Sequence, residues 1–279
     1  RYLIINSGNA NAGTGIDGIK DIEKYCKKIE KEFSCNFKDI LVFSTGVIGE
    51  RIKKDNIIKV IPKLKKGLNK ENWMDFSKSI LTTDTCNKIS SKIIKIGGET
   101  VTITGVAKGS GMIHPNMATM LSFVATDIKI SKIQLNSIHK KLVDRSYNMI
   151  TVDGDTSTND SSILMSTRKS KLSYEKLNSE DKKSFYSNIE SIYIELAKYI
   201  IRDGEGATKF VSININKIKD KKQGKSIGMS VANSLLVKTA LFAEDPNWGR
   251  MLSGIGNSDT SIKDLSNIEI YLGKILIFK

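Results

Sequence analysis

The stretch from residue 105 to residue 121, GVAKGSGMIHPNMATML, holds the densest set of residues that could do chemistry. Within it, Ala118 precedes Thr119, and a strand-like run follows at once. A small residue before a hydroxyl residue at the start of a strand suits an N-to-O acyl shift, in which the hydroxyl attacks the preceding carbonyl and the ester is hydrolysed. The new N-terminal threonine would carry an α-amine with an ordinary pKa of about 8, which can serve as a general base. Thr119 is therefore a candidate nucleophile, although an ordinary sheet threonine is the commoner outcome for such a pair.

Phosphate and metal chemistry fit the sequence less well. A Walker-type loop needs GxxxxGK followed by Ser or Thr, and here Lys108 precedes its glycines. The acidic run VDGDTSTND, with Asp153, Asp155 and Asp160, lacks the glycine and the glutamate of a calcium loop, so we expect a structural loop near the site. Two histidines and three cysteines without CxxC spacing predict no metal site and no disulfide framework.

Six further short motifs accompany this stretch in a fixed order along the chain. They are NSGNANAGTG at 6–15, STGVIGE at 44–50, TTDT at 82–85, VDGDTSTND at 152–160, DGEGATK at 203–209 and EDPNWGR at 244–250. Together with GVAKGSGM and PNMATML, they closely resemble the glutamate N-acetyltransferase family of arginine biosynthesis, also called ornithine acetyltransferases. The resemblance runs from the first residues to about Arg250.

The resemblance assigns catalytic roles to three residues. Thr119 matches the nucleophile and the first residue of the family's β chain, so Ala118 and Thr119 flank the cleavage site. Thr45 and Gly46 match the pair that forms the oxyanion hole, and a hydroxyl and a backbone N–H at the end of a strand can face a developing alkoxide. Without the family, a simple turn would be the preferred interpretation of these two residues.

The resemblance also assigns substrate contacts to Thr119 itself and to three further residues. Lys108 matches a lysine that would pair with the substrate α-carboxylate, whereas a lone lysine is more often solvated. Thr82 matches a second contact, with Thr83 and Thr85 as near-equivalent candidates. Glu205 matches an acidic residue suited to the amine end of ornithine, and its alternative role is to end a helix beside a glycine. The motif EDPNWGR is expected to be structural, with its tryptophan packed.

By this resemblance the chain is a glutamate N-acetyltransferase, also called an ornithine acetyltransferase. The amine of Thr119 would deprotonate its own hydroxyl, which takes the acetyl group from N-acetylornithine and passes it to glutamate by a ping-pong route. Some family members also accept acetyl-CoA as donor, and no metal or tightly held cofactor is implied. An N-terminal-nucleophile amidohydrolase, which would release acetate to water, and a basic binding protein, which would stay uncut, are the alternatives.

The family pattern also predicts the chain organisation. Residues 1–118 would form an α chain, partial at its N-terminus, and residues 119–279 a β chain, partial at its C-terminus, with interlocked pairs associating as a heterotetramer. Three positions depart from the family: Gly13 replaces a cysteine, Asn87 a proline and Ala243 a glycine. The family's N-terminal strands and further substrate contacts fall outside this chain, so we expect a fragment lacking both termini.

The composition of the chain limits which classes of binding partner we expect. The formal net charge is +14, but only six of the 44 basic residues are arginines and the lysines are dispersed over polar helix faces, which disfavours nucleic-acid binding. No stretch approaches the roughly 20 apolar residues that span a bilayer, and no basic-then-apolar signal opens the chain, so we expect a cytoplasmic protein without a membrane partner.

Periodicity predicts the elements that must position these residues. Strands are expected at 2–6, 40–44, 91–108 as a hairpin around Gly97 and Gly98, 120–127 and 209–215. Helices are expected at 22–33, with Cys26 in the core, at 56–68 with a kink or restart at Pro62, and at 72–81, 131–145, 181–201 and 227–236. Hairpins mixed with helices favour a layered α/β or α+β fold, with sheets covered by helices, over a doubly wound parallel sheet.

Overall fold

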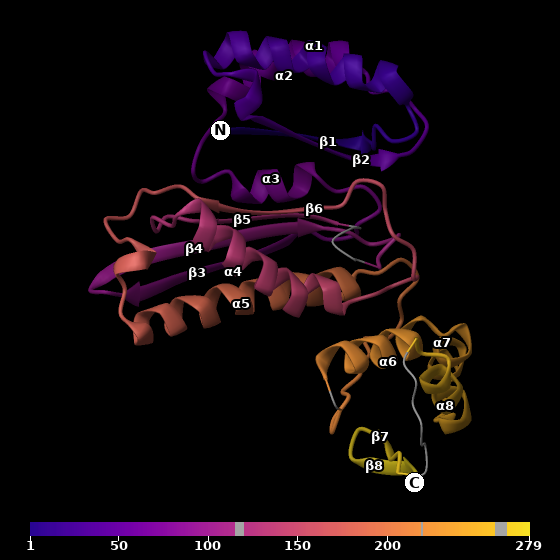
Figure 1. Cartoon of the computed structure of the whole chain (residues 1–279). Helices are drawn as coiled ribbons and strands as arrows, with labels where there is room; N and C mark the ends of the chain where they lie inside the picture. The colour runs from indigo at the N-terminus through magenta and orange to yellow at the C-terminus, as the bar shows by residue number, and fades with distance from the viewer. Residues whose placement is uncertain (115–119, 219, 260–266) are drawn as a thin grey trace.

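The computed structural model describes residues 1–114, 120–218, 220–259 and 267–279, and its elements form layers (Figure 1). A two-stranded sheet carries two helices on its outer face, and a four-stranded sheet carries two helices on the opposite outer face. The two sheets face each other, and a short helix lies on the inner side of the four-stranded sheet. Three helices and a small hairpin follow towards the C-terminus. This arrangement confirms the predicted α/β layered fold with helices covering sheets.

The two-stranded sheet and the helices that cover it form a βαβ unit followed by a second helix. Its elements are β1 (Tyr2–Asn9), α1 (Gly15–Phe33), a 3-10 turn (Phe37–Asp39), β2 (Ile40–Val47) and α2 (Lys54–Lys66). The strands are parallel, as a crossover through a helix requires. Tyr25, Cys26 and Ile29 recur at helical spacing and are buried, which confirms the expected core position of Cys26. The predicted restart at Pro62 is wrong, because α2 continues through it with Ile61 buried in the same core.

The second sheet has the order β3-β4-β5-β6. Its strands are β3 (Lys88–Ile96), β4 (Glu99–Lys108), β5 (Leu121–Thr126) and β6 (Ser161–Ser166). The predicted hairpin is confirmed: β3 and β4 are antiparallel around Gly97 and Gly98, whose φ angles of 53° and 78° suit a primed two-residue turn. β5 is antiparallel to β4 and parallel to β6, so Lys108 and Ser161 both pair with Leu121.

Helices cover both faces of the second sheet. They are α3 (Trp73–Ser79), α4 (Lys132–Arg145) and α5 (Ser179–Arg202), with 3-10 turns at Tyr147–Met149 and Tyr174–Lys176. Ser131 and Asn178 cap α4 and α5, because each side chain accepts the N–H three residues further on. These helices confirm the predictions at 72–81, 131–145 and 181–201 to within a few residues at each end.

Strand β5 is the centre of the packing, since all of its residues are buried. Val124 faces the large core formed with α4 and α5. Phe123 faces the first sheet, where its ring lies edge-on to Phe43 of β2 with centroids 5.1 Å apart. A strand buried on both faces fixes the order helix, sheet, sheet, helix, and it brings the end of β2 over the end of β4.

The C-terminal elements correct three predictions. They are α6 (Lys221–Asn233), α7 (Leu235–Phe242), α8 (Trp248–Gly256), β7 (Ile270–Leu272) and β8 (Ile275–Phe278). The helix expected at 227–236 begins earlier and breaks at Ser234, which caps α7. The strand expected at 209–215 is wrong: the segment joins no described sheet, and alternation alone supplies no partner strand. Trp248 is 46% exposed and stacks on Phe278, so the packed tryptophan is also wrong.

The close approach of α5 to β4 gives a stability prediction. A Cβ on Gly105 would lie 2.9 Å from Leu196 Cδ1 and 3.0 Å from Ile192 Cγ2, both buried on α5. We expect Gly105→Ala to lower the free energy of unfolding by about 1–3 kcal/mol through overpacking, measured by urea denaturation. Gly256→Ala is the control, since its Cβ meets no atom within 4 Å. Equal stability of both variants would contradict the packing described.

Candidate functional site

Lys108, the last residue of β4, is buried and forms the centre of the candidate site. Its Nζ donates to Thr82 Oγ1 at 2.7 Å and to Thr45 Oγ1 at 3.1 Å, and it lies 3.6 Å from Asp84 Oδ2. These partners come from the end of β2 and from the segment between α3 and β3. The structure therefore brings Thr45, Thr82 and Lys108 together from three separate motifs.

Thr45 and Gly46 belong to β2 rather than to a simple turn. Gly46 has φ of 132°, and a Cβ there would lie 2.2 Å from the carbonyl carbon of Gly8 and 2.5 Å from the nitrogen of Asn9. Only glycine allows β1 to approach so closely. Neighbouring Ser44 is buried and donates to the Ala10 carbonyl at 2.5 Å, so it anchors the two strand ends.

The acidic partner of Lys108 is itself held by several donors. Asp84 Oδ1 accepts from Lys88 Nζ at 2.6 Å and from the Gly109 N–H at 2.7 Å. Burial would raise the pKa of Asp84, but the hydrogen bond from Lys88, the charge of Lys108 and the Gly109 N–H outweigh it and lower that pKa. Burial lowers the pKa of Lys108, and the nearby Asp84 carboxylate partly offsets this effect.

Lys88 joins Asp84 to a residue far along the chain. Its side chain is 0% exposed, and its Nζ lies 2.5 Å from Asp203 Oδ2. The backbone N–H of Thr85 donates to Asp203 at 3.0 Å, and the Thr85 hydroxyl also donates to it. Thr82, but not Thr85, is therefore directed at Lys108, which separates two candidates that the sequence left nearly equivalent.

Glu205 lies beside the residues that follow Lys108. Its backbone N–H donates to the Ser110 carbonyl at 3.0 Å, and a Cβ on Gly111 would lie 2.6 Å from Glu205 Oε2. Glu205 is exposed, and the hydrogen bonds of Lys108 within the described part of the chain go to Thr45 and Thr82 and not to the Glu205 carboxylate. Glu205 therefore lies near Lys108 in the fold, but its carboxylate does not contact the Lys108 ammonium.

The predicted cleavage residues, Ala118 and Thr119, lie outside the described residues. The next residue, Met120, is described: its carbonyl accepts from the Ser161 N–H at 2.8 Å. Leu121 pairs with Lys108, so the chain enters β5 at the end of the sheet where Lys108 lies. The role of Thr119 as nucleophile stays a prediction.

The loop at 152–160 confirms part of what its composition indicated. Asp153 accepts backbone N–H groups of Met112 at 2.6 Å and of Ile113 at 2.9 Å, so it is structural. Asn159 Nδ2 donates to Ser44 Oγ at 2.9 Å and also to the Ala10 carbonyl. The loop therefore ties the glycine-rich segment to the β1–β2 strand ends.

Asp160, the last residue of this loop, is an unusual carboxyl group. Its Oδ2 is buried and has no hydrogen-bond partner among the residues described. Burial raises the pKa of Asp160 to about 8, although the Ser157 N–H and the charge of Lys108 act in the opposite direction. In the register of β5 and β6 it directly precedes Ser161, which pairs with Leu121.

The sequence interpretation singled out neither Asp84, Lys88 nor Asp203. Asp84 and Asp203 lie within the motifs TTDT and DGEGATK, in which the threonines and Glu205 were the predicted contacts. In the amino-acid sequence, nothing distinguishes the buried Lys88 from the many exposed lysines of this chain. One signal could have indicated Asp84 and Asp203: each is an acidic residue inside a motif that contributes to the same predicted site.

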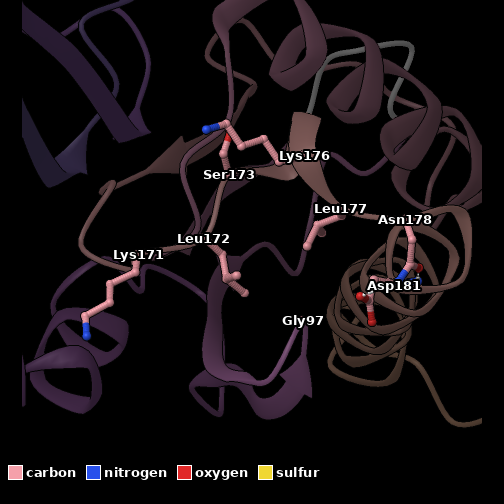
Figure 2. A pocket seen from close by; sticks show the side chains of 8 residues that line it. All are labelled: Gly97, Lys171, Leu172, Ser173, Lys176, Leu177, Asn178 and Asp181. Carbon is pink, nitrogen blue, oxygen red and sulfur yellow. Dashed lines mark hydrogen bonds between the residues drawn. The ribbon is translucent and has the colours of Figure 1, made fainter.

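A pocket lies at the opposite end of the sheet (Figure 2). Leu172, Leu177 and Asp181 line it beside the Gly97 turn. From that turn to Lys108 the chain runs the full ten residues of β4, a distance of about 33 Å at roughly 3.3 Å per residue. This pocket is therefore separate from the candidate site.

The described residues contain neither a metal-binding cluster nor a membrane-spanning helix. Within them, no group of three or more His, Cys, Asp or Glu side chains could hold a metal ion. No helix in those ranges is long and apolar enough to cross a bilayer.

The buried Asp160 gives a pH-dependent stability prediction. The pKa of Asp160 is about 8 in the folded protein, against 3.8 for the free group. Between about pH 4 and pH 8 the carboxyl therefore ionises in the unfolded chain but stays protonated in the folded one, so the contribution of Asp160 to the free energy of unfolding falls as pH rises. We expect Asp160→Asn to melt at a higher temperature than the unchanged protein at pH 8, with the gap closing at pH 4. Calorimetry at both pH values measures it, and a gap independent of pH would contradict the raised pKa.

The chain matches known proteins over its whole length. The model of the ArgJ family matches residues 1–279. The arginine biosynthesis bifunctional protein ArgJ of Methylococcus capsulatus is 43% identical over 277 residues, covering 99% of this chain and 68% of that protein. The protein of the same name from Neisseria meningitidis serogroup A is 44% identical over 282 residues, with the same coverage.

A solved structure agrees with these relatives. The crystal structure of the arginine biosynthesis bifunctional protein ArgJ from Bacillus halodurans is 33% identical, with a TM-score of 0.50 over 55% of this chain and 71% of that one. The family model matches residues 1–279 of this chain, and the two relatives exceed 40% identity over nearly the whole chain. The chain therefore belongs to the ArgJ family of enzymes, the glutamate N-acetyltransferase family that its motifs predicted.

Proposed function

We propose that this protein moves the acetyl group of N-acetylornithine to glutamate through an acetyl-Thr119 ester, after cleaving its own backbone between Ala118 and Thr119. The observation that carries the proposal is the contact of the Lys108 ammonium with the Thr45 and Thr82 hydroxyls at the end of the sheet where β5 begins. The relatives named bifunctional arginine biosynthesis proteins support it. Acetyl-CoA as a second acetyl donor is consistent with that name.

The reaction uses Thr119 as both nucleophile and base. Its α-amine takes the proton of its hydroxyl, and the oxygen attacks the acetyl carbonyl carbon. The Thr45 hydroxyl and the Gly46 N–H stabilise the oxyanion, and loss of one such donor costs about 3 kcal/mol in the transition state. The ornithine amine leaves with the proton, and the glutamate amine then attacks the ester and restores the free hydroxyl.

Substrate binding falls to the charged and hydroxyl groups around Lys108. The Lys108 ammonium pairs with the α-carboxylate of the amino acid, and Thr82 adds a hydroxyl contact. The exposed carboxylate of Glu205, beside Gly111, suits the terminal amine of ornithine. No metal or resident cofactor is part of this mechanism.

Cleavage would leave two interlocked chains, residues 1–118 and 119–279. Strands β4 and β5 would then belong to different chains and still share a ladder, and Lys88 of one chain would remain paired with Asp203 of the other. We expect pairs of such units to form a heterotetramer. The cytoplasmic location stays a prediction.

The first test concerns cleavage. We expect the intact mass of the purified protein to show two polypeptides, the second beginning TMLSF. Thr119→Ala should stay uncleaved and lose transfer, because the attacking oxygen is gone. Thr167→Ala, which removes an exposed threonine just beyond β6, is the control and should be cut and active. One uncut, active polypeptide would rule out the proposal.

The second test separates transfer from hydrolysis. With N-acetylornithine as donor, added glutamate should give N-acetylglutamate in place of free acetate, because the amine competes with water for the ester. Mass spectrometry of the products measures the partition. Acetate as the sole product at any glutamate concentration would favour an N-terminal-nucleophile amidohydrolase.

A further inference from the structure

We propose that Lys108 is a positioning residue for the oxyanion hole: it sets the direction of the Thr45 hydroxyl, and the buried Lys88–Asp84 pair holds it in place for this task. The inference rests on the proposed function, since it takes Thr45 as the donor to the oxyanion. It gives Lys108 a role in the chemical step that is separate from binding the substrate carboxylate.

The direction of the hydroxyl follows from hydrogen-bond chemistry. An ammonium group has three N–H donors and no acceptor, so the 3.1 Å contact requires that Thr45 Oγ1 accepts from Lys108 Nζ. The hydroxyl hydrogen of Thr45 must then point away from Lys108. An oxygen that accepts from a cation is also a stronger donor through its own hydrogen, because hydrogen bonds in a chain polarise one another.

The three oxygens around the ammonium fix its place before substrate arrives. Besides Thr45 Oγ1, they are Thr82 Oγ1 at 2.7 Å and Asp84 Oδ2 at 3.6 Å. Lys108 is 6% exposed, so water does not replace these partners easily. The Thr45 hydroxyl is thus oriented in the substrate-free protein, as a preorganised oxyanion donor must be.

Asp84 is fixed in turn from its other side. Its Oδ1 accepts from Lys88 at 2.6 Å and from the Gly109 N–H at 2.7 Å, which leaves Oδ2 for Lys108. Lys88 is fully buried and also pairs with Asp203, so two cations and two carboxylates balance in one cluster. A carboxylate held by these donors cannot rotate away without leaving a buried lysine short of a partner.

The test uses an acetyl donor without an amino-acid carboxylate. With p-nitrophenyl acetate, the rate of the first-turnover burst of p-nitrophenol on protein shown to be cleaved reports the acetylation of Thr119, before hydrolysis of the acetyl ester limits turnover. We expect Lys108→Met to slow it about tenfold or more. Lys108→Gln, whose amide N–H can still donate to Thr45, should recover part of the loss. Lys95→Met, an exposed lysine of β3, is the matched control.

Two further measurements complete the test: a double-variant cycle between Lys108 and Thr45, and a variant of Asp84. In a Thr45→Val background, Lys108→Met should add little further loss, because the hydroxyl it orients is absent. Asp84→Asn keeps Lys108 and its charge, and it should also slow acetylation. An unchanged rate for Lys108→Met with this ester, or fully additive losses, overturns the proposal. Rapid acetylation of Thr119→Ala instead refutes the proposed nucleophile itself.

Discussion

The contact between a buried lysine and a buried aspartate, Lys88 to Asp84, is the interaction on which the candidate site depends. Two charges removed from water are stable only when their hydrogen-bonding groups are satisfied, and removing one partner of a buried pair typically costs about 3–5 kcal/mol. Here Lys88 contacts Asp84 and Asp203, while Asp84 contacts Lys88, Gly109 and Lys108. The pair therefore fixes the end of β4 and the segment before β3 relative to the end of α5.

The sandwich of two sheets supplies the rest of the geometry. Because β5 is buried on both faces, the first sheet must pack directly on the second, with Phe43 against Phe123. That contact carries the end of β2 to the end of β4, where Thr45 meets Lys108. The glycine at position 46 then allows β1 to close beside it. Packing thus brings residues distant in sequence to one place, and the charged cluster fixes their orientation.

Much of the fold could be predicted from local patterns, and the failures have physical causes. The Gly97–Gly98 hairpin and the capped helices α4 and α5 carry their signals within a few residues. The segment at 209–215 alternates like a strand but joins no described sheet, because a strand also needs a partner backbone. The break at Ser234 depends on one capping hydroxyl inside an otherwise helical pattern.

The candidate site, like the fold, was predictable from the sequence only in part. The family motifs named Thr45, Thr82 and Lys108, and the structure places these three in contact. Lys88 could not be found in that way, because its role depends on burial against Asp203, 115 residues away in the sequence. Nothing local separates such a lysine from the many exposed ones. Charge clusters formed by distant residues therefore need the folded chain to be recognised.

The central claim is that the acetyl group passes through the side-chain oxygen of Thr119, and a trapping measurement tests it most directly. The purified protein is mixed with N-acetylornithine carrying an isotope-labelled acetyl group, without glutamate, and its peptides are sequenced by mass spectrometry. The account predicts the label on the hydroxyl oxygen of the residue that begins the peptide TMLSF, and its transfer to glutamate when glutamate is added. Label on a different residue, or rapid transfer with no labelled peptide, would contradict it.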